Sequence, residues 1–180
     1  MGLATVKTGK LLYHLTDIKN LPSIIKHGLL SRMELQKTIT KFSDIANPEI
    51  IIKRKNTNLD RYIPLHFHPY SAFDTIVKRS NPKKDFIYLC ITRDFARQQG
   101  FLILPKHPLS KIDYDTCSPL PYDEGFNNID WDTMSKTNEQ LRDNENYAKQ
   151  VKMAECLANR PIKIEEFFCI YTKNDKNQKK

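Results

Sequence analysis

The chain has 180 residues, of which 39% are hydrophobic and 28% are charged, as in an ordinary soluble globular protein of one domain. No apolar run approaches the roughly 20 residues of a membrane-spanning helix, and the N-terminus lacks the apolar core of a signal peptide, so we expect a cytoplasmic protein. The formal net charge of +8 favours a polyanionic partner, of which nucleic acid is the commonest. We place the domain at 1–172 and expect a basic, disordered tail at 173–180.

Residues 11–30 carry the clearest local organisation. The apolar run 11–13 is typical of a buried strand, and the polar residues within 14–17 then predict a turn. Pro22 suits the first turn of a helix and Gly28 suits the left-handed residue that ends one. We therefore expect a strand, a polar turn and a short helix, with polar groups at the strand end where ligands often bind.

The rest of the chain alternates short strands and short helices without a regular βαβα pattern, which predicts the α+β class. The two prolines in 62–70 predict a strand that is short or lies at a sheet edge. The proline-rich stretch 105–128 predicts a long functional loop. We expect the other strands at 85–91, 101–104, 150–157 and 167–171, and helices at 32–40, 71–78, 130–144 and between Thr92 and Gly100.

Two groups of residues could carry chemistry. Glu155 lies in an apolar stretch, where a carboxylate is costly unless it is used or is paired with Lys152 or Arg160. His14 is either a site residue or a hydrogen-bonded core histidine.

His66 and His68 would share one face of a strand and could bind a metal. No third ligand of matching spacing is apparent, and the four cysteines form no C-x-x-C pair, so we expect no metal site. The basic residues at 53–55 could grip phosphates or form a solvated face.

Four blocks, in order, resemble the DarT family of DNA ADP-ribosyltransferase toxins. Tyr-His-Leu-Thr at 13–16, with Asn-Leu-Pro-Ser-Ile at 20–24 and Gly-Leu-Leu at 28–30, is similar to the family's opening motif. The segment 62–71 resembles its Y-[VI]-P-F-Y-F-x-P-x-S block, and Ile-Asp-Trp at 129–131 resembles its L-D-W segment. Ala-Glu-Cys-Leu at 154–157 resembles its catalytic A-E-F-L strand.

The resemblance implies the ADP-ribosyltransferase fold, with two small, mostly antiparallel sheets and packed helices around an NAD cleft. It implies a toxin that transfers ADP-ribose from NAD to a base of single-stranded DNA, without a metal, as a monomer with a macrodomain antitoxin. Glu155 would contact the nicotinamide ribose, and Arg54 would meet the NAD phosphates. His14, Thr16 and Asn20 would hold NAD.

The sequence departs from the family at some positions. His66 and His68 replace residues that are more often aromatic or polar, Cys156 replaces phenylalanine, and 101–110 matches a Gly- and Asp-rich block poorly. These departures concern the target base and the DNA contacts more than the NAD chemistry.

Two other functions compete with this one. A basic nucleic-acid-binding domain would explain the charge but would give Glu155 no task. The His14-x-Thr16 element also occurs in two-histidine phosphoesterases, but these need a second H-x-[ST], which the sequence lacks.

Overall fold

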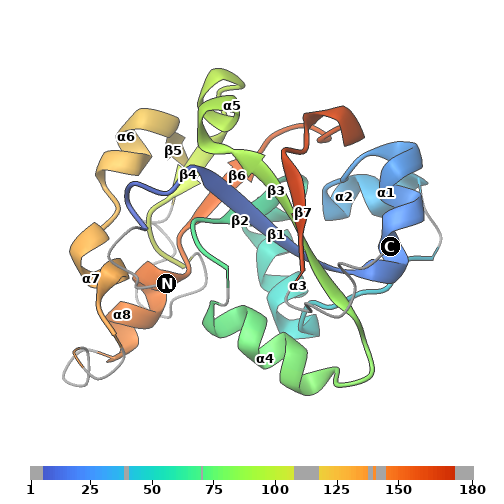
Figure 1. Ribbon diagram of the computed structural model, residues 1–180, viewed down its shortest axis with the longest axis horizontal. Helices are drawn as coiled ribbons and strands as arrows, with labels where there is room; N and C mark the ends of the chain where they lie inside the picture. The colour runs from blue at the N-terminus through green and yellow to red at the C-terminus, as the bar shows by residue number, and fades with distance from the viewer. Residues whose placement is uncertain are drawn as a thin grey trace.

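The computed structural model describes residues 6–38, 41–69, 71–107, 118–137, 140 and 145–172. A seven-stranded sheet in the order β5-β4-β6-β2-β1-β3-β7 crosses this part of the chain (Figure 1), and all its recorded pairings are antiparallel. The strands are β1 (Leu11–Asp17), β2 (Ile63–His66), β3 (Phe86–Thr92), β4 (Leu102–Leu104), β5 (Leu120–Pro121), β6 (Glu155–Ala158) and β7 (Cys169–Tyr171).

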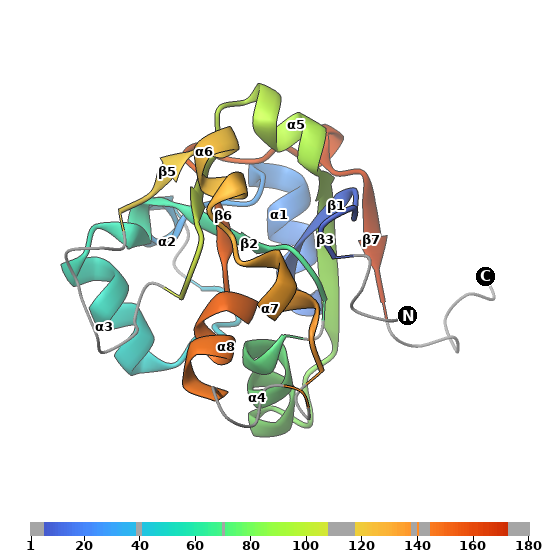
Figure 2. The same cartoon turned by 90° about the vertical axis from the view of Figure 1, so that its left-hand side faces the viewer.

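The helices surround this sheet. Figure 1 shows α6, α7 and α8 gathered at one end of the molecule and α1 and α2 at the other, while Figure 2 shows α5 and α4 at opposite sides of the sheet. The α-helices are α1 (Leu21–His27), α2 (Arg32–Thr38), α3 (Pro48–Asn56), α4 (Ala72–Ser80), α5 (Arg93–Gln98), α6 (Tyr122–Asn127), α7 (Trp131–Ser135) and α8 (Glu145–Lys152). The 3-10 helices are η2 (Ile18–Asn20), η3 (Leu59–Arg61) and η6 (Ile164–Glu166). No helix among the described residues is long and apolar enough to cross a membrane.

Local capping explains where several helices begin. Ser71 and Asp74 form a capping box at the start of α4, so two backbone N–H groups that the helix leaves free gain partners. Thr92 accepts a hydrogen bond from the Phe95 N–H and starts α5, which ends before Gly100 as predicted. Asp130 caps α7 by accepting from the Thr133 N–H.

The core lies on both faces of the central strands. Leu89 and Ile91 of β3 pack into the larger hydrophobic cluster, while Tyr88 and Cys90, which alternate with them, pack into a second cluster. Because both faces of β3 are covered, its sequence is continuously apolar, and the buried strand predicted at 85–91 is confirmed.

Gly28 ends α1 with a φ of 78°, a conformation that favours glycine. A Cβ atom at Gly28 would lie 2.8 Å from the carbonyl oxygen of Ile162. Leu29 pairs with Ile162 in an isolated bridge, so this glycine lets the chain after α1 approach the segment that follows β6. The glycine at this helix end was predicted, but its close contact with Ile162 was not.

The sheet differs from the prediction in two ways, and β2 decides between two alternatives. The described residues form one sheet where two were expected. The strand predicted at 11–13 continues to Asp17, so the turn predicted at 14–17 is wrong; the polar side chains of this stretch find partners while the backbone stays in the ladder. β2 is short, which was one of the two alternatives, and it lies inside the sheet instead of at an edge. Its recorded ladder with β1 is the single pair Tyr13↔His66. Pro64, which has no N–H to donate, is therefore tolerated there.

Three predicted boundaries in the second half are also wrong. The strand predicted at 150–157 begins only at Glu155, because α8 continues to Lys152. The loop predicted at 105–128 is interrupted by β5 and α6. The helix predicted at 130–144 ends at Ser135. Residues 108–117 and the tail predicted at 173–180 lie outside the described residues.

Candidate active site

A cavity of about 180 Å³ opens beside β1 and β2. Four of the five residues predicted for the site line it together, although they come from β1, η2 and α3. Its polar and charged lining includes His14, Thr16, Asn20, Ser31, Arg32, Ser43, Asp44, Arg54 and His66, and its apolar lining includes Leu15, Ile24, Leu29, Phe42, Ile45 and Phe73.

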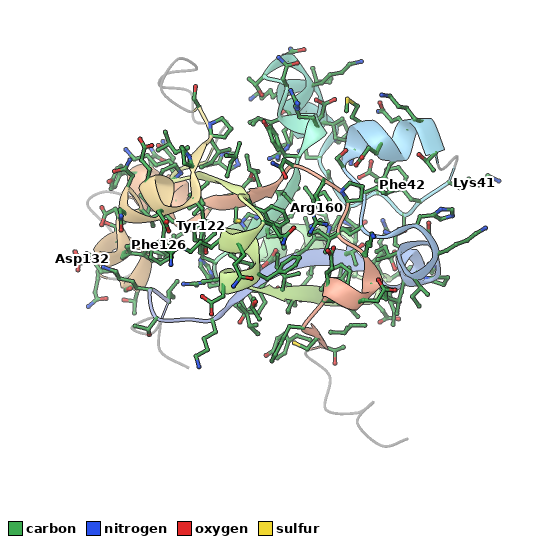
Figure 3. The ribbon with its side chains drawn as sticks, turned by 90° about the horizontal axis from the view of Figure 1, so that it is seen from above. Lys41, Phe42, Tyr122, Phe126, Asp132 and Arg160 are labelled. Carbon is green, nitrogen blue, oxygen red and sulfur yellow. The ribbon has the colours of Figure 1, made fainter. Side chains whose placement is uncertain are left out.

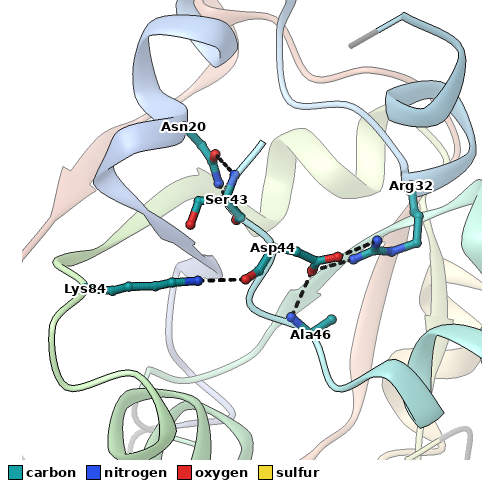
Figure 4. Close-up of polar contacts among 6 residues, drawn as sticks. All are labelled: Asn20, Arg32, Ser43, Asp44, Ala46 and Lys84. Atoms are coloured by element: carbon teal, nitrogen blue, oxygen red, sulfur yellow. Dashed lines mark hydrogen bonds and ion pairs between the residues drawn. The ribbon is translucent and has the colours of Figure 1, made fainter. Parts of the chain in front are cut away.

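Asn20 fixes one wall of this cavity. Its Nδ2 donates to Thr16 Oγ1 at 3.1 Å. Its Nδ2 also donates to the Ser43 carbonyl at 3.0 Å, and its Oδ1 accepts from the Ser43 N–H at 2.8 Å (Figure 4). Asn20 thus ties the end of β1 to residues 41–47, the segment before α3.

Charged groups hold the same segment from two other sides. The guanidinium of Arg32 donates to both carboxylate oxygens of Asp44 at 2.8 Å, and Lys84 Nζ donates to the Asp44 carbonyl at 2.8 Å (Figure 4). Ser43 Oγ donates to Asp17 Oδ2 at 2.6 Å. Burial raises the pKa of Asp44, but the hydrogen bonds from Arg32 outweigh this and hold it below its ordinary value.

The guanidinium carbon of Arg32 lies over the Phe42 ring, 5.5 Å from the centroid of that ring. Phe42 lies at the end of the molecule opposite Asp132 (Figure 3). Tyr122 and Phe126, which stack with their ring centroids 6.1 Å apart, also lie far from it (Figure 3). The cavity and this aromatic pair are therefore separate features of the molecule.

Glu155, the fifth predicted residue, is buried at the start of β6 and bonded to Arg54. Both of its carboxylate oxygens accept from Arg54 Nη1 at 2.9 Å, and the side chains are 6% and 13% exposed. Burial alone would raise the pKa of Glu155, but the charge of Arg54 and the proximity of His66 hold it below its ordinary value. Glu155 is therefore an ionised carboxylate beside the cavity that Arg54 lines.

The salt bridges suggested by sequence, from Lys152 or Arg160 to Glu155, do not form. Lys152 Nζ donates to the Lys136 carbonyl, and Arg160 binds Glu166 at 2.8 Å. The prediction that Glu155 forms a salt bridge is confirmed, but the predicted partners were wrong. The partner is Arg54, which lies 101 positions away, so no pattern near Glu155 could indicate it.

His14 is a hydrogen-bonded histidine, as one interpretation had it, and it also lines the cavity. Its Nδ1 donates to the Pro64 carbonyl at 2.8 Å, which leaves Nε2 as the acceptor of a neutral ring. Burial lowers the pKa of His14, which favours that neutral form.

The two histidines considered as metal ligands, His66 and His68, do not lie together on one strand. β2 ends at His66, and both ring nitrogens of His68 lie 3.1 Å from backbone carbonyl oxygens, those of Pro69 and Lys152. Within the described ranges, no group of three or more His, Cys, Asp or Glu side chains could hold a metal ion.

Sequence reasoning missed Arg32, Ser43 and Asp44 as cavity residues. Ser43 and Asp44 are placed by contacts with Asn20 and Lys84, and Arg32 is placed by its contact with Asp44. No local sequence pattern signals these contacts. His66 was considered only as a metal ligand, although its place in the motif at 62–71 could have marked it as a cavity residue.

The DarT family model, described as ssDNA thymidine ADP-ribosyltransferase, matches residues 13–180. The chain belongs to the DarT family. A DNA ADP-ribosyl transferase–DNA ADP-ribosyl glycohydrolase fusion protein of Thermosipho africanus is 27% identical over 100 residues, which are 51% of this chain and 26% of the fusion protein. The chain thus spans well under half of that curated relative.

Solved DarT structures share the fold. The Thermosipho africanus DarTG complex with ADP-ribose matches with a TM-score of 0.68 at 20% identity, over 92% of this chain and 44% of that chain. Thermus sp. 2.9 DarT in complex with ADP-ribosylated ssDNA matches with a TM-score of 0.70 at 17% identity, over 92% and 82%. The same protein in complex with NAD⁺ matches with a TM-score of 0.64 at 16% identity, over 92% and 83%. These matches confirm the expected ADP-ribosyltransferase fold.

Proposed function

We propose that this DarT-family chain transfers ADP-ribose from NAD to a thymine base of single-stranded DNA. The observation that carries the proposal is the buried ion pair of Glu155 and Arg54 beside a cavity that His14, Thr16 and Asn20 also line. The base follows from the family's description, and single-stranded DNA is favoured because the base must leave a stack to react.

The cavity suits a dinucleotide in its chemistry. Its apolar surfaces, among them Phe42 and Ile45, offer contact to flat rings, and Arg54 and Arg32 supply positive charge for a pyrophosphate. Of the two, we assign the pyrophosphate to Arg54, as the family resemblance implies. His14, Thr16 and Asn20 would hold the rest of the NAD molecule.

Glu155 would supply the main electrostatic contribution. When the bond between the ribose carbon and the nicotinamide nitrogen breaks, positive charge develops on the ribose, and a nearby carboxylate stabilises that charge more than the ground state. Nicotinamide leaves with the bonding electrons, a base nitrogen bonds the ribose carbon, and the proton lost by that nitrogen passes to Glu155 or to water.

The partners follow from the same assignment. The fusion protein of Thermosipho africanus carries a DNA ADP-ribosyl glycohydrolase by name, so we propose that a macrodomain antitoxin with that activity opposes this chain. We further propose a cytoplasmic monomer that acts as the toxin of the pair, with residues 1–172 as its single domain.

The deciding experiment incubates the full chain with NAD and a thymine-containing single-stranded oligonucleotide. We expect NAD consumption that depends on DNA, and mass spectrometry should find one ADP-ribose added to the oligonucleotide. A matched oligonucleotide without thymine is the control for the base. DNA binding without NAD consumption would instead support the nucleic-acid-binding domain, and phosphodiester cleavage would support the phosphoesterase.

A further inference from the structure

His66, at the end of β2, has no place yet in the proposed chemistry. Its Cα is paired in register with Glu155 of β6, and directly opposed residues of an antiparallel ladder project from the same face. The ring of His66 also lines the cavity. A ligand group that reaches Glu155 from this cavity therefore passes close to His66.

One ring nitrogen of His66, Nδ1, has no hydrogen-bond partner among the described residues. The residue is only 8% exposed, and this nitrogen is buried. The neighbouring histidines differ, because His14 bonds the Pro64 carbonyl and His68 lies between two carbonyl oxygens. A buried polar atom without a partner costs stability, and such atoms in native proteins call for an explanation in function or in bound water.

We propose that the His66 imidazole hydrogen-bonds a hydroxyl of the ribose that Glu155 faces. An imidazole nitrogen can donate to or accept from a ribose hydroxyl, and the partner that the fold lacks would then come from the substrate. The family block quoted above has tyrosine at this position, so this chain places imidazole nitrogens where that block has a phenol hydroxyl. The inference rests on the proposed function, because it takes NAD as the occupant of the cavity.

Calorimetric titration of the full chain with NAD and with ADP tests this contact, because ADP lacks that ribose. His66→Phe keeps a ring and removes both nitrogens, so it should weaken NAD binding roughly fivefold to tenfold, the effect of one hydrogen bond. ADP binding should stay within about twofold, because a lost hydrogen bond is felt only by the ligand that makes it.

Two further variants separate hydrogen bonding from shape. His66→Asn places a polar atom near the position of Nδ1, and His66→Gln places one near Nε2, so one of the two should restore most of the lost NAD affinity. His68→Phe is the matched control, because it removes an imidazole two positions away that does not line the cavity. It should lower the melting temperature and leave NAD affinity unchanged.

The outcomes distinguish this inference from the proposed function. A wild-type chain that binds no NAD would overturn both. Normal NAD binding by a folded His66→Phe variant would overturn the ribose contact alone, as would equal losses for NAD and ADP. A loss that neither Asn nor Gln restores would show that His66 acts through shape only, and it would also overturn the contact.

Discussion

Arg54 and Glu155 form a buried charge pair in which each residue depends on the other. Removing one partner of such a pair leaves an uncompensated buried charge, which typically costs about 3–5 kcal/mol of stability. Within the described part of the chain, the further contact of the Arg54 guanidinium is a long one of 3.4 Å from Nη2 to the Leu59 carbonyl. Substitutions here must therefore keep a partner for the remaining charge if activity is to be separated from folding.

Glu155→Gln meets that condition, because its amide oxygen can still accept from Arg54. We expect this variant to remain folded and to lose DNA modification by a factor of about 100 or more, since the developing charge on the ribose loses its carboxylate. Glu155→Ala should be equally inactive and less stable. Oligonucleotide mass spectrometry and thermal melting measure the two effects. A folded Glu155→Gln variant with normal activity would show that Glu155 is only structural.

Arg54→Lys tests whether Arg54 serves NAD or DNA. Lysine keeps the charge and loses the planar fork, so a residue that orients a pyrophosphate near the breaking bond should not tolerate it. We expect strongly reduced turnover with DNA affinity near that of wild type, measured by steady-state kinetics and fluorescence anisotropy. Weaker DNA binding with normal turnover of the bound complex would place Arg54 on the DNA-binding face.

The lowered pKa of Glu155 predicts how the pair responds to acid. Because the folded-state pKa lies below the unfolded value of about 4.3, the ionised carboxylate stabilises the fold above that value. This contribution is lost as the pH falls through the folded-state pKa. Urea unfolding of wild type and Glu155→Gln from about pH 7 to about pH 3 should show a stability difference that shrinks below about pH 4.3. A constant difference would mean that the carboxylate does not titrate in this range.

At the residue scale, ordered motifs predicted more of the cavity lining than chemistry alone could. His14, Thr16 and Asn20 lie within seven positions of one another, so a short pattern captured them. The burial of Glu155 was predicted from its apolar neighbours, but its partner Arg54 was not, because the fold alone brings them together. Asp44 and Ser43 were missed for the same reason.

At the scale of elements, local signals predicted the presence of a helix or strand better than the residues at which it begins and ends. Thr92 and Asp130 marked two helix starts, and the apolar run at 85–91 marked a buried strand, since each signal is contained in a few adjacent residues. The polar residues of β1 were assigned to a turn because their side-chain partners, such as Pro64 and Ser43, are distant in sequence. Tertiary hydrogen bonds here outweigh local polarity.

The capping box of α4 gives a prediction at this scale. Ser71→Ala removes the oxygen that accepts from the Asp74 N–H, so we expect a loss of about 1 kcal/mol in the free energy of unfolding. Urea denaturation measures it, with exposed Ser80→Ala as a control that should change little. Equal effects of the two substitutions would show that the cap contributes nothing. Because Phe73 of α4 lines the cavity, we also expect slightly weaker NAD binding by Ser71→Ala.

At the scale of the whole molecule, the net charge of +8 bears on how DNA is held. Each DNA phosphate neutralised by a lysine or arginine releases counterions, so the logarithm of the affinity falls linearly with the logarithm of the salt concentration, by roughly 0.7 per phosphate for single strands. NAD carries far fewer phosphate charges than a DNA strand, so its binding releases far fewer counterions. The two ligands should therefore respond to salt to different degrees.

We expect affinity for a single-stranded oligonucleotide to fall steeply between about 50 mM and about 200 mM salt, while NAD affinity changes little. Fluorescence anisotropy measures the first and calorimetry the second. The slope then tells how DNA is recognised. A steep slope means that phosphates hold the strand and that sequence preference must come from few contacts near Glu155. A flat slope would contradict this and would mean that bases are held mainly by stacking and hydrogen bonds, with the excess charge of the molecule playing no part in binding.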